Sequence, residues 1–364
     1  MFDEAPAEVC ILRLSAIGDC CHVLPVVRTL QAAWPETRFT WIIGATEASL
    51  VGDIPDIDFV VFDKSGGLAS FRRLRSALRG RRFDLLLHMH PSMRANLVTL
   101  AVSAKIRLGF DRARAKDCQG LFTNCRIESK DRQHVMDGLF GFAQAVGVSD
   151  RVLRWDIPLS EADRTFAAEQ SGEGQPLLVL SPCSSARRGR RENFRNWRPE
   201  HYAAVADHAV ARHGARVVLT GDASEAAHAF TRHVLNEGRE VIVDLVGKTS
   251  LKRLLALLDR AAALVCPDSG PAHMGTAVGT PVIGLYASTN PDRAGPYANR
   301  DYTVNRYAGA VMQEYGRRVE DLPWGTRVHD PSAMQLILVE EVCRQVDRVF
   351  ERGHDGGSVS EASA

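Results

Sequence analysis

An acidic residue stands directly after the first apolar run of the chain. The run Val9–Leu14 leads into a loop of small residues that ends at Gly18 and Asp19, and a helical pattern follows. An aspartate at the start of a helix commonly accepts hydrogen bonds from free backbone N–H groups, so Asp19 can be a helix cap. A carboxylate held on such a loop can also take a proton from a hydroxyl as a general base. The spacing alone leaves both interpretations open.

A second loop has the composition of an anion-binding site. The sequence PDSGPAH (residues 267–273) follows an apolar run that ends at Cys266, and Asp268 in it could orient the loop or a sugar hydroxyl. Ser269 and Gly270 would present backbone N–H groups at the start of a helix, where a phosphate or pyrophosphate binds well. A Ser–His–Asp triad with His273 is disfavoured, because three members within one turn do not easily form the required relay. Helix capping without a ligand remains the alternative.

Two arginine-rich stretches interrupt an otherwise balanced distribution of charge. The earlier one contains cations and no acid: Lys64, Arg72, Arg73, Arg75, Arg79, Arg81 and Arg82. A solvated helix face explains such a run, and contact with an anionic partner is the alternative. The later stretch, residues 187–198, follows the small-residue turn Ser181–Ser185. Its arginines suit phosphate or carboxylate recognition, because a guanidinium offers a fork of donors.

Several nucleotide and metal motifs fail. Gly247-Lys248-Thr249 resembles the end of a P-loop, but Ile242 occupies the position of its first glycine. No G-x-G-x-x-G follows a strand, and the cysteines and histidines lack zinc-finger spacing. No carboxylate pair of the DxD type has a convincing place on a loop. We therefore expect neither a metal ion nor a cofactor.

The elements that must hold these loops alternate between strand and helix patterns. Apolar, β-branched runs predict strands at Val9–Leu14, Phe39–Ile43, Phe59–Phe62, Leu85–Met89, Ile106–Phe110, Leu177–Leu180, Arg216–Leu219, Val241–Leu245, Leu264–Cys266 and Val282–Leu285. Helical spacing predicts a helix around Val23–Trp34 with Pro25 in its first turn, and further helices at Pro199–His213, Ser224–Leu235, Leu251–Leu258 and Pro271–Val278. This alternation implies parallel sheets covered by helices on both faces. Ligands of such sheets bind beyond the carboxyl ends of the strands, where both loops lie.

Length and composition indicate an ordinary two-domain protein. A chain of 364 residues corresponds to two domains at about 150 residues each. The polar segment Pro158–Gln175 is the best linker, so we expect domains over residues 1–165 and 175–330, a closing helix over 331–350 and a disordered tail over 353–364. The formal net charge of +1 disfavours a dedicated nucleic-acid binder. The acidic start MFDEAPAE lacks the features of a signal peptide, and the pattern of cysteines suits a reduced, cytoplasmic protein.

Two segments together carry a resemblance to a known family. They are ILRLSAIGDCCHVLPVVRTL near the start and VCPDSGPAHMGTAVGTPVIGLYASTNPDRAGPY near the end. The order S-x-x-G-D, then H-x-x-P, then D-[ST]-G-x-x-H resembles glycosyltransferase family 9, the ADP-heptose:lipopolysaccharide heptosyltransferases, over residues 9 to 345. The resemblance implies a GT-B fold of two Rossmann-like, doubly wound parallel-sheet domains facing across a cleft. It also implies inverting transfer with Asp19 as the general base.

The resemblance implies a set of binding residues as well. Those for the donor are Ser184, Ser185, Arg195, Glu225, Thr249, Asp268, Ser269, Gly270 and His273. The family has a lysine before a Trp-Pro pair, whereas this chain has Arg195-Asn196-Trp197-Arg198-Pro199, so Arg195 or Arg198 supplies the cation. Those for the acceptor, matched more loosely, are Gly18, Arg94 and Lys116.

The function expected from the resemblance is metal-independent transfer of heptose from ADP-heptose to the lipopolysaccharide core, with Kdo-lipid A or an inner-core heptose as acceptor. The basic stretch of residues 64–82 would then meet this anionic acceptor or the cytoplasmic face of the inner membrane, with a solvated helix face as the alternative. A GT-B nucleotide-sugar epimerase, a family 9 transferase for another activated sugar, and a non-catalytic sugar-nucleotide binding protein are the other readings. No nucleic-acid partner is expected.

Overall fold

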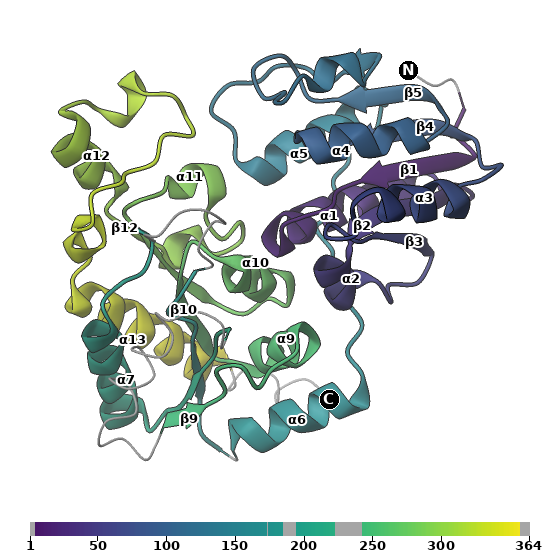
Figure 1. Ribbon diagram of the computed structural model, residues 1–364. Helices are drawn as coiled ribbons and strands as arrows, with labels where there is room; N and C mark the ends of the chain where they lie inside the picture. The colour runs from purple at the N-terminus through teal and green to yellow at the C-terminus, as the bar shows by residue number, and fades with distance from the viewer. Residues whose placement is uncertain (1–3, 173, 185–193, 223–241, 357–364) are drawn as a thin grey trace. The chain divides into compact units, whose positions relative to one another are not determined.

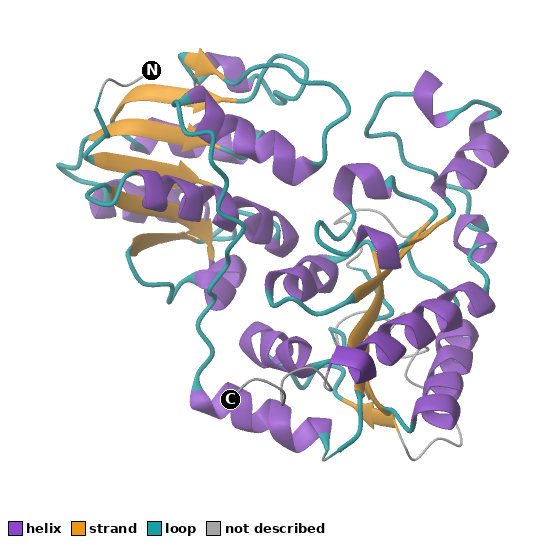
Figure 2. Cartoon of the chain, turned by 180° about the vertical axis from the view of Figure 1, so that it is seen from behind, coloured by secondary structure: helices purple, strands orange, loops and turns teal. Residues whose placement is uncertain are grey.

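The structure is a computed structural model that describes residues 4–172, 174–184, 194–222 and 242–356. The chain divides into two compact units, Met1–Pro158 and Leu159–Ala364 (Figure 1). Each unit contains one six-stranded parallel sheet with helices packed on both of its faces (Figure 2). Among the described residues, no helix combines the length and the apolar character that crossing a bilayer requires.

The sheet of the first unit has the order β3-β2-β1-β4-β5-β6. Its strands are β1 (Glu8–Leu12), β2 (Arg38–Gly44), β3 (Ile57–Phe62), β4 (Phe83–His88), β5 (Ala104–Gly109) and β6 (Cys125–Arg126). Its helices are α1 (Ile17–Ala33), α2 (Ala45–Val51), α3 (Gly67–Ala77), α4 (Met93–Val98) and α5 (Val135–Ala145). Because β1 pairs in parallel with both β2 and β4, the segments that follow these three strands emerge side by side.

Apolar side chains bury the middle of this sheet on both faces. The side chains from Val9 to Leu12 are fully buried, as are Leu85–Leu87 of the neighbouring strand. Such continuous apolar runs are typical of central parallel strands, which helices cover on each side. This burial gives the loop after β1 a rigid base.

Pro25 lies in the middle of α1, so its predicted place in the first turn of a helix was wrong. A proline there cannot donate to the carbonyl oxygen of Cys21, four residues earlier. The indole Nε1–H of Trp155 donates to that oxygen instead, at 2.7 Å. The helix can therefore continue through the proline because a side chain from a distant segment satisfies the carbonyl.

The sheet of the second unit has the order β12-β11-β10-β7-β8-β9. Its described strands are β7 (Leu177–Leu180), β8 (Arg216–Leu219), β9 (Ile242–Asp244), β10 (Ala263–Pro267), β11 (Val282–Tyr286) and β12 (Val304–Asn305). Its described α-helices are α6 (Glu161–Ser171), α7 (Pro199–His213), α9 (Leu251–Arg260), α10 (Gly270–Ala277), α11 (Pro291–Ala294), α12 (Tyr307–Tyr315) and α13 (Val339–Gly356). Helix α13 packs against α7, and α6 packs against α9.

Most of the predicted elements are confirmed. Every predicted strand is present with its ends within two residues of those observed, and α7 has the predicted bounds. The two-residue edge strands β6 and β12 were not predicted, because so short a run carries no periodic signal. The predicted helix Ser224–Leu235 lies outside the described residues.

The expected linker is largely helical. Helix α6 occupies most of residues 158–175 and begins with a capping box, in which Ser160 Oγ accepts the Asp163 N–H at 3.2 Å. Its packing against α9 places it in the second unit. The closing helix α13 starts at Val339, after a 3₁₀ turn at Ala333–Leu336, and continues to Gly356. The remainder of the expected tail, residues 357–364, lies outside the described residues.

Candidate active site

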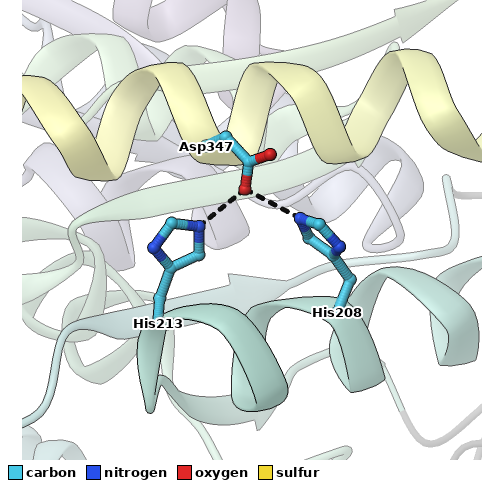
Figure 3. Close-up of side chains that lie close together, drawn as sticks. All are labelled: His208, His213 and Asp347. Atoms are coloured by element: carbon cyan, nitrogen blue, oxygen red, sulfur yellow. Dashed lines mark hydrogen bonds and ion pairs between the residues drawn. The ribbon is translucent and has the colours of Figure 1, made fainter.

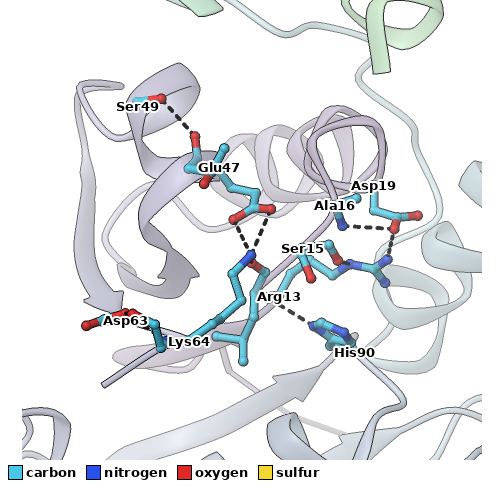
Figure 4. Close-up of polar contacts among 12 residues, drawn as sticks. Arg13, Ser15, Ala16, Asp19, Glu47, Ser49, Asp63, Lys64 and His90 are labelled. Atoms are coloured by element: carbon cyan, nitrogen blue, oxygen red, sulfur yellow. Dashed lines mark hydrogen bonds and ion pairs between the residues drawn. The ribbon is translucent and has the colours of Figure 1, made fainter. Parts of the chain in front are cut away.

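Asp19 is the third residue of α1 and caps that helix. Its Oδ2 accepts a hydrogen bond from the Ala16 N–H at 3.1 Å. The same oxygen forms an ion pair with the guanidinium of Arg13, while the Asp19 side chain remains 35% exposed (Figure 4). The cap and the ion pair fix the carboxylate without burying it. Asp19 can therefore cap the helix and still be exposed enough to act as a general base.

Arg13 connects the loop after β1 to the end of β4. Its Nε donates to the Ser15 carbonyl oxygen at 2.7 Å, and its Nη1 donates to the Met89 carbonyl oxygen at 2.6 Å. The Arg13 side chain is only 10% exposed, and its backbone carbonyl accepts a hydrogen bond from Trp41 Nε1 at 3.2 Å. Arg13 therefore sets the position of Asp19. It was missed in the sequence because it lies inside the apolar run that predicts β1.

His90, which follows β4, forms a hydrogen bond with the backbone of the same loop. Its Nδ1 accepts the Leu14 N–H at 3.1 Å, so the proton of the neutral ring is carried by Nε2 (Figure 4). Burial, together with the positive charge of Arg13, lowers the pKa of His90 to about 3. The imidazole is therefore neutral at physiological pH and stands near Asp19 as a hydrogen-bond donor.

Lys64, the first cation of the basic stretch, forms a hydrogen bond with the same loop and an ion pair with α2. Its Nζ lies 2.9 Å from Glu47 Oε2 and 3.3 Å from the Leu14 carbonyl oxygen (Figure 4). Arg73 pairs with Asp63 at 3.4 Å, and Arg81 pairs with Asp58. The exposed side chains of this stretch for which the described residues offer no ion-pair partner are Arg72, Arg75, Arg79 and Arg82. Only this part of the stretch presents unpaired charge.

Two predicted acceptor residues lie on neighbouring segments of the first unit. Arg94 is exposed on α4, and Lys116 is exposed on the loop after β5. Asp117 joins the two segments, since its Oδ2 accepts the Met93 N–H at 2.9 Å and its carbonyl oxygen accepts from Asn96 Nδ2 at 2.6 Å. Gly18 is buried as the second residue of α1. The structure therefore groups Arg94 with Lys116 and keeps Gly18 beside Asp19 on α1.

In the second unit, the loop between β10 and α10 has the geometry of an anion site. Ser269 is the N-cap of α10 in extended conformation, and Gly270 begins the helix. The hydroxyl of Ser269 does not cap the helix, and it is buried without a hydrogen-bond partner among the described residues. Burial raises the pKa of the nearby Cys266 thiol to about 12, and the Ser269 hydroxyl partly opposes this rise. A thiol is only a weak hydrogen-bonding group. The N–H groups of the first turn are therefore not occupied by the side chain that usually caps them.

Arg195 lies against this loop. Its Nη1 donates to the Asp268 carbonyl oxygen at 2.9 Å and lies 3.8 Å from Asp268 Oδ2. The positive charge of Arg195 offsets the carboxylate that would otherwise oppose a phosphate. Arg198, by contrast, is exposed at the N-cap of α7, next to the buried Trp197.

The remaining predicted donor residues are distributed as follows. Ser184, after β7, donates from its N–H to Asn196 Oδ1 at 2.9 Å and from its Oγ to the same atom at 3.1 Å. Thr249 is half-buried just before α9, and His273 is buried within α10. Ser185 and Glu225 lie outside the described residues. The structure thus links the segments of Ser184, Arg195 and Asp268 through hydrogen bonds.

Comparison with solved structures identifies the class of fold. The chain superposes on the glycosyl transferase family 9 protein from Veillonella parvula with a TM-score of 0.76 at 21% identity, over 95% of this chain and 97% of that one. It superposes on the E. coli ADP-heptose lps heptosyltransferase II with a TM-score of 0.72 at 18% identity, over 95% and 99%. The protein has the GT-B fold, as the sequence predicted.

Comparison of sequences identifies the family. The model of glycosyltransferase family 9 (heptosyltransferase) matches residues 71–318. The chain is 37% identical to the lipopolysaccharide core heptosyltransferase OpsX of Haemophilus influenzae over 349 residues, which cover 96% of this chain and 99% of that protein. The protein belongs to glycosyltransferase family 9 and is a glycosyltransferase, which confirms the predicted resemblance and enzyme class.

Proposed function

We propose that this enzyme transfers heptose from ADP-heptose to a hydroxyl of the lipopolysaccharide core. The identity of 37% over almost the full length of a lipopolysaccharide core heptosyltransferase is the observation that carries the proposal. The acceptor we propose is Kdo-lipid A or an inner-core heptose, and the reaction takes place at the cytoplasmic face of the inner membrane.

Asp19 is the general base of the proposed reaction. One of its carboxylate oxygens takes the proton of the acceptor hydroxyl as the acceptor oxygen attacks the anomeric carbon. The bond between that carbon and the diphosphate breaks, ADP leaves, and the configuration of the sugar inverts. The partial exposure of Asp19 and its fixed position next to Arg13 support this role.

The loop between β10 and α10 binds the donor diphosphate in this proposal. Backbone N–H groups at the start of α10 and the guanidinium of Arg195 stabilise the negative charge of the leaving ADP. Ser184, Ser185, Thr249, Glu225 and His273 complete the donor site. Two of these, Ser185 and Glu225, rest on the family motif alone.

In this proposal, exposed cations of the first unit bind the anionic acceptor. Arg72 and Arg75 on α3 are exposed, and so are Arg94 and Lys116. Phosphate and carboxylate groups of a lipopolysaccharide precursor suit such side chains. Replacing Arg72 and Arg75 together by glutamate should raise the KM for the acceptor several-fold and leave the KM for ADP-heptose unchanged. An unchanged acceptor KM would indicate that these residues form only a solvated helix face.

The proposed function is tested by measuring ADP release from ADP-heptose in the presence and absence of Kdo-lipid A. We expect release that depends on the acceptor, with a heptosylated lipid as the second product. Conversion of the sugar without acceptor would indicate an epimerase. If a nucleoside diphosphate is released with acceptor only from a different nucleotide sugar, the proposed donor is wrong.

A further inference from the structure

A cluster of two histidines and one aspartate joins α13, the last described helix, to α7. Asp347 on α13 accepts hydrogen bonds through the single atom Oδ1 from His208 Nε2 at 2.7 Å and from His213 Nε2 at 2.6 Å (Figure 3). The three ligand atoms all lie within 4.8 Å of one another. The proposed transfer reaction uses none of these side chains.

The local structure explains why the three side chains meet. His208 lies within α7, and His213 is its last residue, followed by Gly214 in the left-handed conformation that ends the helix. Asp347 faces both rings because α13 packs alongside α7, and the ring of Phe350 lies against His213 with centroids 5.0 Å apart. The side chain of His213 is only 8% exposed, whereas Asp347 is 21% exposed. The cluster is thus preformed on two rigid helices.

The donor set matches the coordination chemistry of a divalent transition metal. Two imidazole nitrogens and a carboxylate oxygen are common ligands of Zn²⁺, at about 2.0–2.2 Å each. Ligands of a tetrahedral ion at that distance are about 3.3 Å apart, so the N–O separations of 2.7 and 2.6 Å need to grow by about 0.6–0.7 Å. Hydrogen bonds from both histidines, and the charge of Arg212, hold the pKa of Asp347 below its ordinary value although partial burial opposes this. The carboxylate is therefore in the ionised form that a metal requires.

Two neighbouring side chains determine how such a site would behave. Arg212 Nε lies 3.3 Å from Asp347 Oδ1, and its Nη2 lies 3.5 Å from Glu351. Arg212 is 56% exposed, so it can leave Asp347 and remain with Glu351 when a cation arrives. Cys343 precedes Asp347 by one helical turn, but burial raises the pKa of its thiol to about 11. The site therefore offers nitrogen and oxygen ligands, and Arg212 competes with the metal.

We propose that His208, His213 and Asp347 bind one divalent transition-metal ion, with Zn²⁺ the best fit, and that this ion fastens α13 to α7. On binding, the Nε2 atoms that donate protons to Asp347 become metal ligands, and each ring carries its proton on Nδ1 instead. The helix dipole supports the site, because His213 is at the carboxyl end of α7, where a cation is favoured. That end of α7 leads directly into the amino end of β8, whereas the proposed donor loops follow the carboxyl ends of β7 and β10 in the same parallel sheet. The ion would therefore stabilise the second unit and take no part in sugar transfer.

The test uses the tag-free, full-length protein, first stripped with EDTA and then dialysed into metal-free buffer. Titration with ZnCl₂ should give about one bound ion per chain that is lost in Asp347→Asn. At a hundredfold excess of free Zn²⁺ over its dissociation constant, the Tm should rise by about 5 °C, and Asp347→Asn should lose this rise. Co²⁺ in place of Zn²⁺ should give visible absorption without a thiolate charge-transfer band.

Arg212→Gln is the matched variant. If the cluster were only a hydrogen-bonded link between the two helices, this substitution would not change the affinity for Zn²⁺. Removing this cation should strengthen Zn²⁺ binding by roughly fivefold, because a positive charge next to the ligands is lost. His208→Gln, which can still donate a hydrogen bond to Asp347, should fold like the wild type and bind Zn²⁺ no better than Asp347→Asn. The proposal is overturned if the wild type and Asp347→Asn bind Zn²⁺ equally, or if Arg212→Gln leaves the affinity unchanged.

Discussion

The two units hold their strand-end loops in different ways. The loop after β1 is fixed by charged and polar side chains, because Arg13, Lys64 and His90 each form hydrogen bonds with its backbone. The loop after β10 instead presents the start of α10, with one guanidinium beside it and the Ser269 hydroxyl buried without a partner among the described residues. The first arrangement positions a single carboxylate, whereas in the second the side chain of the N-cap residue leaves the first turn of α10 uncapped.

This difference fits the roles that we propose for the two loops. A general base needs a fixed direction, and an ion pair with several buried hydrogen bonds supplies it. A diphosphate is large and highly charged, and the N–H groups of a helix N-terminus can surround its oxygens. Variants in the first unit should therefore change the rate of the chemical step or the stability of the loop that holds Asp19. Variants in the second unit should change the affinity for the nucleotide.

Arg13→Ala is expected to have the largest effect on stability. It removes the ion pair with Asp19 and leaves the carbonyl oxygens of Ser15 and Met89 without their donor. The free energy of unfolding of the first unit should fall by about 3 kcal/mol, as measured by urea denaturation. Calorimetric titration with ADP should show the same Kd as the wild type. A weaker affinity would mean that nucleotide binding also depends on Arg13 and is not a property of the second unit alone.

Arg195→Ala should affect the second unit and spare the first. Loss of a charge-assisted contact with the diphosphate is expected to cost about 2 kcal/mol, so the Kd for ADP should rise about thirtyfold. Arg198→Ala is the matched control, because this arginine is exposed and lies at the start of α7. If Arg198→Ala weakens ADP binding more than Arg195→Ala, the assignment of the phosphate contact is reversed.

The stability of the first unit should depend on His90 in acid. The pKa of His90 is lowered to about 3, so between pH 3 and the ordinary value near 6.5 the unfolded chain binds a proton that the folded one does not. Stability contributed by the neutral ring is complete above pH 6.5 and declines as the pH falls below it. His90→Gln should remove about 2 kcal/mol of the stability lost between pH 7.5 and pH 5, as measured by urea unfolding at both values. An unchanged pH dependence would mean that another group is responsible.

Ser269→Ala should have the smallest effect of this series. Its hydroxyl is buried without a hydrogen-bond partner among the described residues, so its removal should not lower the free energy of unfolding of the ligand-free protein. If the hydroxyl turns to the diphosphate when ADP binds, the Kd should rise about fivefold. A clear loss of stability without ADP would show that the hydroxyl has a structural partner.

The sequence predicted the longer strands of this protein and several of its helices. The bounds of α7 follow from Pro199 at its start and Gly214 after its end. The β10–α10 loop follows from an apolar run that ends at Cys266 and is followed by Asp268, Ser269 and Gly270. Residues whose role depends on the order of strands were not found. Arg13 reaches Met89 only because β1 lies beside β4, and Trp155 supports α1 only after the chain has returned to that helix.

The basic stretch shows the same limit. A run of cations without acids gives no sign of which side chains will find partners in three dimensions. Lys64 pairs with Glu47, and Arg81, just before β4, pairs with Asp58 of β3, which β2 and β1 separate from β4 in the sheet. Helix α6, within the expected linker, was not predicted because it buries only Ala167 and Ser171 and has a weak apolar pattern.

The most direct test of the account is the effect of Asp19→Asn on two quantities measured with the same preparation. Asparagine keeps the size of the side chain, and its amide oxygen can still accept the Ala16 N–H, but it cannot take a proton from the acceptor. We predict that kcat for acceptor-dependent ADP release falls by about a hundredfold or more, while the Kd for ADP stays within about twofold of the wild type. Turnover close to that of the wild type would contradict the assignment of Asp19 as the general base.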